Sequence, residues 1–265
     1  MDVHVAIDDT YGPIDAQPTR YVTGARRTYV AVEFPDQQVE EVREGVRACL
    51  NEMPRLLGIS PAEFHFVDIY NRKKVWENAP EGQNLRMFEF FAHMYRQYRW
   101  KVHVQTVDER TLADHKVTLF GKVDGIELNE RDGQALFFLL VKLKNDLPRP
   151  PEKLTIRIDS GRRKSGSAFA SAVFREWESQ YDGRYASSDA EPLIQIADFL
   201  AFSINRSTHL QMKRHLTDID VMFLELVSSM NIRSPDIVHS IGKRNNIMAD
   251  LDAALEKDRA EKGLE

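Results

Sequence analysis

Short apolar runs, separated by amphipathic segments, organise most of this chain and predict its strands and helices. Apolar or alternating runs that are typical of strands occupy residues 3–8, 28–34, 63–70, 101–107, 154–159 and 185–189. Apolar side chains at helical spacing predict helices at residues 36–57, 85–99, 131–146, 166–179, 191–206 and through much of 208–265. Polar or Gly- and Pro-containing connections lie at 12–27, 71–84 and 148–151, and residues 109–130 show no clear pattern.

The order of these elements indicates the fold class. Two strands come early, and the later strands alternate with helices. That order is typical of an α/β protein in which helices flank a mixed sheet. The length of 265 residues suits one large domain, or one domain with an appendage.

Composition and charge exclude some classes of protein but do not identify a function. The apolar share of 42% and the charged share of 29% are ordinary for a globular chain. The net charge of -5 gives no general basic character, so a nucleic-acid partner would need a local patch. No apolar stretch approaches the ~18–20 residues of a membrane span, so we expect no membrane partner. The single Cys49 and the lack of a leader-like N-terminal segment favour a cytoplasmic location.

Three aspartates stand out because each interrupts an apolar element. Asp8 and Asp159 each end a predicted strand, and Asp198 sits inside the apolar helical run 193–201. A carboxylate against an apolar surface is costly unless a positive charge compensates it. If the fold gathers the three acids, a divalent cation would relieve their repulsion. The pattern therefore indicates a metal-dependent enzyme.

Each of these aspartates also has a plainer interpretation. Asp8 and Asp9 lie at the C-terminal end of a strand, where α/β sheets place their sites, but the following residues are also good turn formers. Asp198 shares one side of its helix with other polar residues, which indicates a site. A structural ion pair with Arg206 is the alternative for Asp198.

Glu63 and His65 form a second candidate group. In a strand, side chains alternate between faces, so a strand over 63–70 would place these two residues side by side. A carboxylate beside an imidazole can bind a metal ion or transfer protons. The alternative is a solvated strand face without a function.

A basic loop follows Asp159 and contains Arg162, Arg163 and Lys164. Small residues surround these cations, and the predicted helix at 166–179 would present an N-terminus that favours anions. The loop could therefore bind phosphate, although it lacks the spacing of a P-loop. The alternative is an ordinary solvated loop.

The order of these motifs resembles the domain-of-unknown-function family 3800. The resemblance covers roughly residues 3–206, and the helix motif around Asp198 is its most specific part. The matching segments are Asp8-Asp9-Thr10-Tyr11-Gly12, Glu63-Phe64-His65-Phe66, Ile158-Asp159 and Leu193-Ile194-Gln195-Ile196-Ala197-Asp198-Phe199-Leu200-Ala201. Two departures from the family pattern are Asp9 in place of Glu and Thr10-Tyr11 in place of Ser.

The resemblance implies a ribonuclease H-like domain over residues 1–206, with residues 207–265 as a helical C-terminal extension packed on it. It also implies that Asp8, Glu63, Asp159 and Asp198 hold Mg2+ or Mn2+, with His65 completing the catalytic group. In ribonuclease H-like folds the second acid usually lies on a helix after the third strand, which would point to Glu89. The local motif favours Glu63.

We therefore expect a hydrolase, a metal-dependent phosphodiesterase that cleaves DNA or RNA by two-metal chemistry. The basic loop 162–164 would contact the substrate phosphates. One alternative is a non-catalytic interaction protein that keeps the fold. In such a protein the three aspartates would be spread apart or paired with basic residues. A third is an aspartyl phosphatase with Asp8 as nucleophile, although Thr10 stands where that chemistry uses a second Asp.

Overall fold

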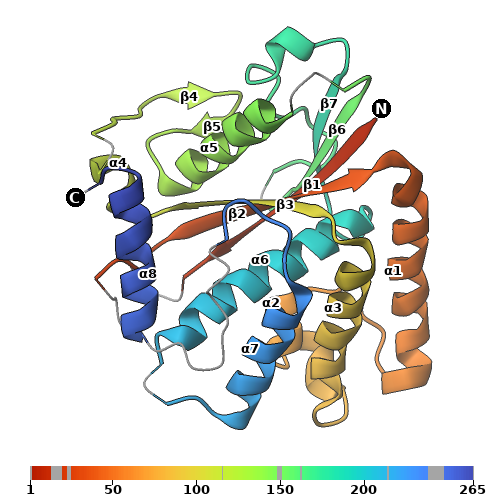
Figure 1. The fold of residues 1–265 in the computed structure, drawn as a ribbon. Helices are drawn as coiled ribbons and strands as arrows, with labels where there is room; N and C mark the ends of the chain where they lie inside the picture. The colour runs from red at the N-terminus through yellow and green to blue at the C-terminus, as the bar shows by residue number, and fades with distance from the viewer. Residues whose placement is uncertain are drawn as a thin grey trace.

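The computed structural model describes residues 2–12, 20–22, 25–114, 116–147, 151–161, 163–213, 215–237 and 248–264. A five-stranded mixed sheet forms its centre (Figure 1). The order across the sheet is β3 (Lys101–Val107), β2 (Arg27–Pro35), β1 (Val3–Tyr11), β6 (Leu154–Asp159) and β7 (Tyr181–Ala186).

The strand directions decide which strand ends meet. β1 pairs antiparallel with β2, β2 antiparallel with β3, and β1, β6 and β7 run parallel. Only β2 therefore runs against the other four strands. The C-terminal ends of β1, β6 and β7 lie at one edge, with Ile7 of β1 opposite Ile158 of β6. This arrangement confirms the predicted α/β fold with a mixed sheet.

Helices cover both faces of the sheet, and each face has its own core (Figure 1). Helix α5 (Arg131–Asp146) packs on the face that carries Val5 and Ile7 of β1. Helices α1 (Asp36–Leu57), α3 (Arg86–Tyr98) and α6 (Pro192–Gln211) bury the face that carries Ala6. Since strand side chains alternate, Asp8 shares the α6 face with Ala6.

The remaining elements are short or lie towards the C-terminus. These elements are α2 (Phe66–Tyr70), α4 (Thr111–Asp114), α7 (Asp218–Met230), α8 (Met248–Glu261), the small strands β4 (Lys122–Val123) and β5 (Ile126–Glu127), and the 3-10 turns Lys74–Asn78, Gln83–Leu85 and Arg175–Trp177. Helix α7 packs against α3 and α6. α6 crosses the predicted boundary at residue 206, and the division into two domains stays a prediction.

Two predicted elements differ in the structure. Residues 63–70 are not a strand, because Phe66–Tyr70 forms α2 and buries Phe66 and Ile69, three positions apart, in one core. The predicted helix at 166–179 is replaced by turns and one 3-10 turn, since Gly166 and Ala170 take positive φ angles of 86° and 56°. A right-handed helix cannot pass through such residues.

None of the helices in the described ranges combines the length and the apolar character that crossing a membrane requires.

Candidate active site

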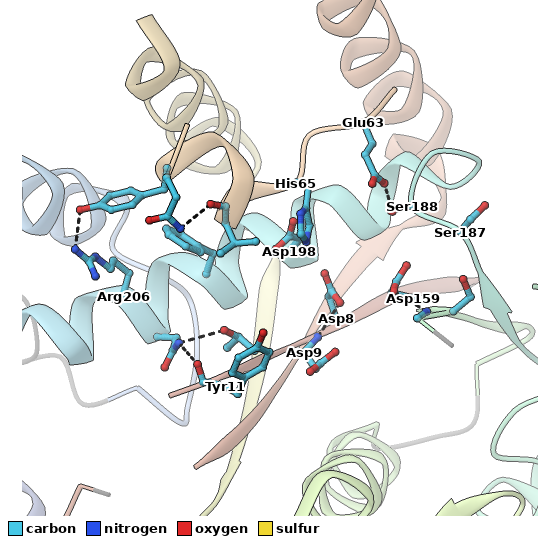
Figure 2. A pocket seen from close by; sticks show the side chains of 18 of the residues that line it. Asp8, Asp9, Tyr11, Glu63, His65, Asp159, Ser187, Ser188, Asp198 and Arg206 are labelled. Atoms are coloured by element: carbon cyan, nitrogen blue, oxygen red, sulfur yellow. Dashed lines mark hydrogen bonds between the residues drawn. The ribbon is translucent and has the colours of Figure 1, made fainter. Parts of the chain in front are cut away.

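A pocket of about 700 Å3 opens where the C-terminal ends of β1 and β6 meet the middle of α6. Five of the predicted site residues line it: Asp8, Glu63, His65, Asp159 and Asp198. Figure 2 shows their side chains directed towards a shared space from four separate segments of the chain. The three aspartates are therefore brought together and not dispersed over the molecule.

Asp8 enters the pocket from the edge of β1 on the α6 face. Its Oδ1 accepts a hydrogen bond of 2.8 Å from the backbone N–H of Asp9. Burial raises the pKa of Asp8 well above its usual value, and the charges of Asp198, Asp9 and Asp159 raise it further. Asp8 forms no ion pair with a basic side chain among the described residues, and the largest influences on its pKa include no positive charge.

Asp198 faces Asp8 from α6. Its Oδ2 accepts a hydrogen bond of 2.9 Å from the backbone N–H of Phe66. Burial raises the pKa of Asp198 to about 7, although the charge of His65 and the Phe66 N–H act in the opposite direction. In the described part of the chain, Arg206 does not pair with Asp198. Its Nη2 donates to the Tyr70 hydroxyl at 2.9 Å, so the alternative of a structural ion pair is wrong.

Asp159 completes the aspartate group at the end of β6. Its Oδ2 accepts a hydrogen bond of 2.8 Å from the N–H of Gly161. Gly161 adopts a φ of 48°, the left-handed conformation in which glycine pays no steric cost. A tight turn therefore follows Asp159 and holds its carboxylate at the rim of the pocket.

Glu63 and His65 reach the pocket from the turn before α2. Glu63 accepts a hydrogen bond from the hydroxyl of Ser188, and His65 Nδ1 lies 2.8 Å from Asp68 Oδ2. Burial lowers the pKa of His65, but the charges of Asp198 and Asp68 outweigh it and raise the pKa overall. The prediction placed both residues at one site, but its argument from a strand face was wrong.

Gln195 ties this turn to α6, and sequence reasoning assigned it no role. Its buried side chain accepts from the N–H of Phe64 at 3.0 Å and donates to the carbonyl of Ser188 at 2.7 Å. The amide thus fixes two loops that border the pocket. The polar side chain of Gln195 within the apolar run 193–201 was the sequence signal that could have indicated this structural role.

Asp9 lies on the other face of β1. Burial and the charge of Asp132 raise its pKa to about 6, while Arg27 lowers it. Asp9 borders the pocket only at its edge, since side chains of neighbouring strand residues point to opposite faces. It therefore differs in role from Asp8 despite their adjacency.

The basic loop does not reach the pocket where the structure describes it. Arg163 donates to the carbonyl of Gly125 at 2.7 Å and lies over the ring of Tyr185. Lys164 is exposed and does not line the pocket, and Arg162 lies outside the described residues. The cation that does line the pocket is Arg206, two helical turns after Asp198 on α6. The alternative second acid, Glu89, borders a separate hollow between α3 and α7.

The donor set of the pocket fits a divalent cation. Carboxylate oxygens with one imidazole are ligands that Mg2+ and Mn2+ accept. Asp8 and Asp198 carry the negative charge that such an ion would neutralise, and only Asp198 has a basic neighbour, His65. Among the described residues, no three donor atoms of the pocket lie within 4.8 Å of one another.

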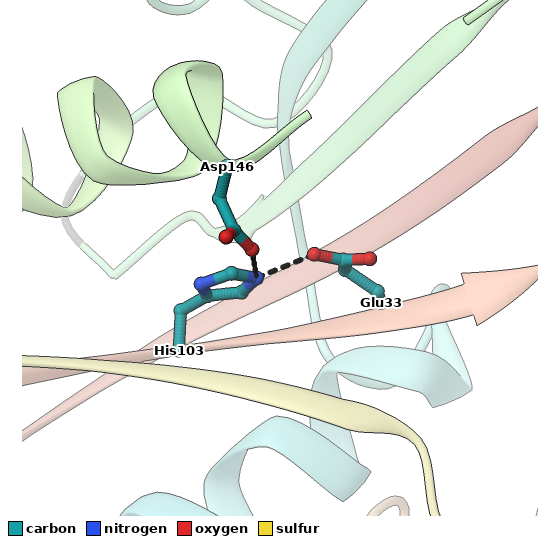
Figure 3. Close-up of side chains that lie close together, drawn as sticks. All are labelled: Glu33, His103 and Asp146. Carbon is teal, nitrogen blue, oxygen red and sulfur yellow. Dashed lines mark hydrogen bonds and ion pairs between the residues drawn. The ribbon is translucent and has the colours of Figure 1, made fainter. Parts of the chain in front are cut away.

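One group in the described residues does meet that distance: Glu33, His103 and Asp146 (Figure 3). It lies towards the opposite ends of the strands, since Glu33 pairs with Val5 and Asp8 pairs with Val30. His103 Nε2 bonds to Glu33 and lies 3.6 Å from Asp146 Oδ2. The Lys101 ammonium also contacts both acids and already compensates their charge, so an ion would have to displace it.

This chain is similar to a solved structure, but it matches no family model and no curated protein. The resemblance to family 3800 therefore stays a prediction. Among solved structures, the crystal structure of Bst-RNase HIII in complex with Mn2+ is similar over 97% of this chain and 70% of that chain, with 10% sequence identity and a TM-score of 0.33.

Proposed function

We propose that this protein is a divalent-metal-dependent phosphodiesterase that cleaves nucleic acid at the pocket of Asp8, Asp159 and Asp198. The observation that carries the proposal is the convergence of three acids from β1, β6 and α6 in one pocket, where the pKa values of Asp8 and Asp198 are raised and only Asp198 has a basic neighbour, His65. Acids that serve only stability are normally paired or solvated. Such a group is costly to the fold and is typical of a functional site.

In this proposal the chain holds Mg2+ or Mn2+ through Asp8, Asp159 and Asp198, with Asp8 central. Glu63 or His65 completes the ligand set. When bound, such ions supply a nucleophilic water and stabilise the charge on the leaving oxygen. Gln195 keeps the turn that carries Glu63 and His65 against α6.

His65 is suited to move a proton at the pocket wall. The Asp68 carboxylate accepts a hydrogen bond from Nδ1 and fixes the orientation of the ring, and Lys74 Nζ lies 2.7 Å from the same Asp68 oxygen. Because Asp68 occupies Nδ1, the Nε2 atom of His65 remains available to groups in the pocket. A positioned imidazole can protonate a leaving oxygen as that oxygen departs.

Thermal melting with Mg2+ or Mn2+ tests the metal site without depending on substrate choice. An ion that binds the folded chain raises its melting temperature, and Asp8→Asn should remove most of that rise. His103→Ala is the matched control, because the group of Glu33, His103 and Asp146 is the other place for an ion. If the rise in melting temperature persists in Asp8→Asn and is lost in His103→Ala, the metal binds at that group instead.

Cleavage assays test the reaction itself. The wild-type chain should cleave at least one of single-stranded DNA, single-stranded RNA, duplex DNA or an RNA–DNA hybrid when Mg2+ or Mn2+ is present. Asp8→Asn and Asp198→Asn should each abolish that activity. No cleavage of any of these substrates by wild-type protein that binds the ion would defeat the proposal.

A further inference from the structure

The pocket has a second half that the metal-binding acids do not occupy. Beyond Asp198, α6 continues with Phe202 and Arg206, which line the same cavity together with Tyr11 and Tyr70. Figure 2 shows Arg206 at one end and Asp159 at the other, with Asp198 and Asp8 between them. One half of the pocket is therefore acidic, and the other is aromatic with one cation.

Arg206 is held firmly but retains hydrogen-bonding capacity. Its guanidinium lies over the ring of Tyr70 at 4.6 Å and donates to the Tyr70 hydroxyl at 2.9 Å. Its buried Nε has no hydrogen-bond partner within the described chain. A guanidinium with free donors, fixed by an aromatic ring, is suited to a phosphate.

The charge of Arg206 is not consumed by the nearby acid. Asp220 lies 3.9 Å from Arg206, but Lys213 Nζ contacts both carboxylate oxygens of Asp220 at 3.0 and 2.8 Å. Lys213 thus compensates Asp220 at shorter range. Arg206 keeps a net positive charge towards the pocket.

Tyr11 provides an exposed aromatic surface at the mouth of the pocket. Its side chain is 62% exposed, and the Arg27 guanidinium lies 4.8 Å from its ring centre. Asn205 of α6 donates to the carbonyl of Tyr11 at 2.8 Å, which fixes this end of β1 beside the pocket. Exposed aromatic rings next to arginines are the surfaces on which single-stranded nucleic acids stack their bases.

The cations at the pocket are too few for a duplex. Arg206 is the one Lys or Arg among the lining residues, all of which the structure describes. Duplex binding depends on many phosphate contacts by Lys and Arg. A cavity of about 700 Å3 is in the range of sites that enclose one small-molecule-sized unit.

We propose that the pocket takes one unpaired nucleotide of a single-stranded nucleic acid, with its phosphate on Arg206 and its base on Tyr11. The proposal rests on the proposed function and specifies its substrate class. The metal-binding acids then face the phosphodiester next to the bound nucleotide. Duplexes would be excluded unless they carry a frayed or unpaired end.

Binding to fluorescently labelled oligonucleotides tests this inference apart from cleavage. Anisotropy is measured in Ca2+ with a single strand and with a blunt duplex of the same sequence. The single strand should bind at least about tenfold more tightly. Arg206→Gln and Tyr11→Ala should each weaken its binding by roughly fivefold or more, as expected for the loss of a phosphate contact or a stacked base.

Conservative variants separate this role from a structural one. Arg206→Lys and Tyr11→Phe should keep most of the affinity, because the charge and the ring remain. Arg55→Gln is the control for charge, since Arg55 is exposed at the end of α1, pairs with Glu52 and does not line the pocket. Melting curves identify any variant that unfolds, and for such a variant the conservative change decides.

Two outcomes overturn the inference while sparing the proposed function. One is duplex binding as tight as single-strand binding, and the other is an Arg206→Gln effect no larger than that of Arg55→Gln. The reverse pattern, with selective single-strand binding but no metal-dependent cleavage, would defeat the proposed function and leave the subsite intact.

Discussion

Asp198 illustrates how one residue can be costly to the fold and useful to a site. Its carboxylate is half-buried, lies near other acids and is stabilised mainly by the Phe66 N–H and by His65. Ionisation of such a group opposes folding, because its pKa is higher in the folded chain than in the unfolded one. The stability that its protonated form contributes is therefore fully present below the ordinary Asp pKa of 3.8 and is lost as pH rises from there through about 7.

We predict that Asp198→Asn stabilises the protein in chelator at pH 8 and that this effect declines as pH falls towards about 4, where the carboxylate is protonated in the unfolded chain as well. Asn keeps the shape and an oxygen for the Phe66 N–H but carries no charge. Melting temperatures should rise by several degrees at pH 8, where roughly 2–4 °C corresponds to 1 kcal/mol in a chain of this size. Glu44→Gln, an exposed change of equal charge on α1, is the control. Destabilisation of Asp198→Asn at pH 8 would mean that Asp198 has a structural partner.

Gln195 is a second residue whose role depends on its hydrogen bonds. Its amide is the partner of the Phe64 N–H and the Ser188 carbonyl in the interior. We predict that Gln195→Met lowers the free energy of unfolding by about 1–3 kcal/mol, because buried polar groups lose their partners. Urea unfolding measures this, with exposed Gln37→Met as the control. Equal effects of the two changes would show that the amide is dispensable.

At the scale of elements, one ion pair joins α1 to α6, the helix that borders the site. Arg43 of α1 contacts Glu191 through two hydrogen bonds of 2.9 and 2.5 Å. Glu191 also caps the start of α6 by accepting from the N–H of Leu193. α6 carries Asp198, Arg206 and Gln195, so this pair fixes the helix that lines one side of the pocket.

We predict that Arg43→Met destabilises the chain by about 3 kcal/mol, because it leaves the largely buried Glu191 carboxylate unpaired. Arg47→Met on an exposed position of the same helix should change stability by less than about 0.5 kcal/mol. Chemical denaturation distinguishes the two. A cost for Arg43→Met as small as that for Arg47→Met would mean that Glu191 is solvated without its partner.

At the scale of the whole molecule, the candidate site exists only where several elements meet. Asp8 and Asp159 come from neighbouring parallel strands, and Asp198 comes from the helix that crosses them. An ion bound by all three would connect β1, β6 and α6. Its binding energy would then oppose the local opening of each of these elements.

We predict that Mn2+ slows amide hydrogen exchange at the C-terminal ends of β1 and β6 and in the first half of α6 together. The same elements should respond at the same ion concentration, because one binding event links them. Exchange measured by mass spectrometry with and without Mn2+ tests this, and Asp8→Asn is the control. Protection confined to β2, β3 and α5 would place the ion at Glu33, His103 and Asp146 instead.

The sequence by itself determined the elements whose periodicity extends over several turns or a whole strand. The helices at 36–57 and 131–146 and the strands at 101–107 and 154–159 have the predicted bounds. Their apolar spacing is long enough to favour one structure locally. Three acids in apolar runs also sufficed to single out Asp8, Asp159 and Asp198, because a carboxylate there is costly in any fold.

Tertiary structure alone decided the short segments and the partners across the pocket. Residues 63–70 became the turn and α2 because burial of Phe66 and Ile69 outweighed a brief alternation of side chains. The Arg163 side chain bonds to the carbonyl of Gly125 and does not line the pocket, whereas Arg206 of α6 does line it. The conformations of these segments depend on contacts between residues far apart in the chain. The free-energy differences that local sequence patterns produce are too small to determine them.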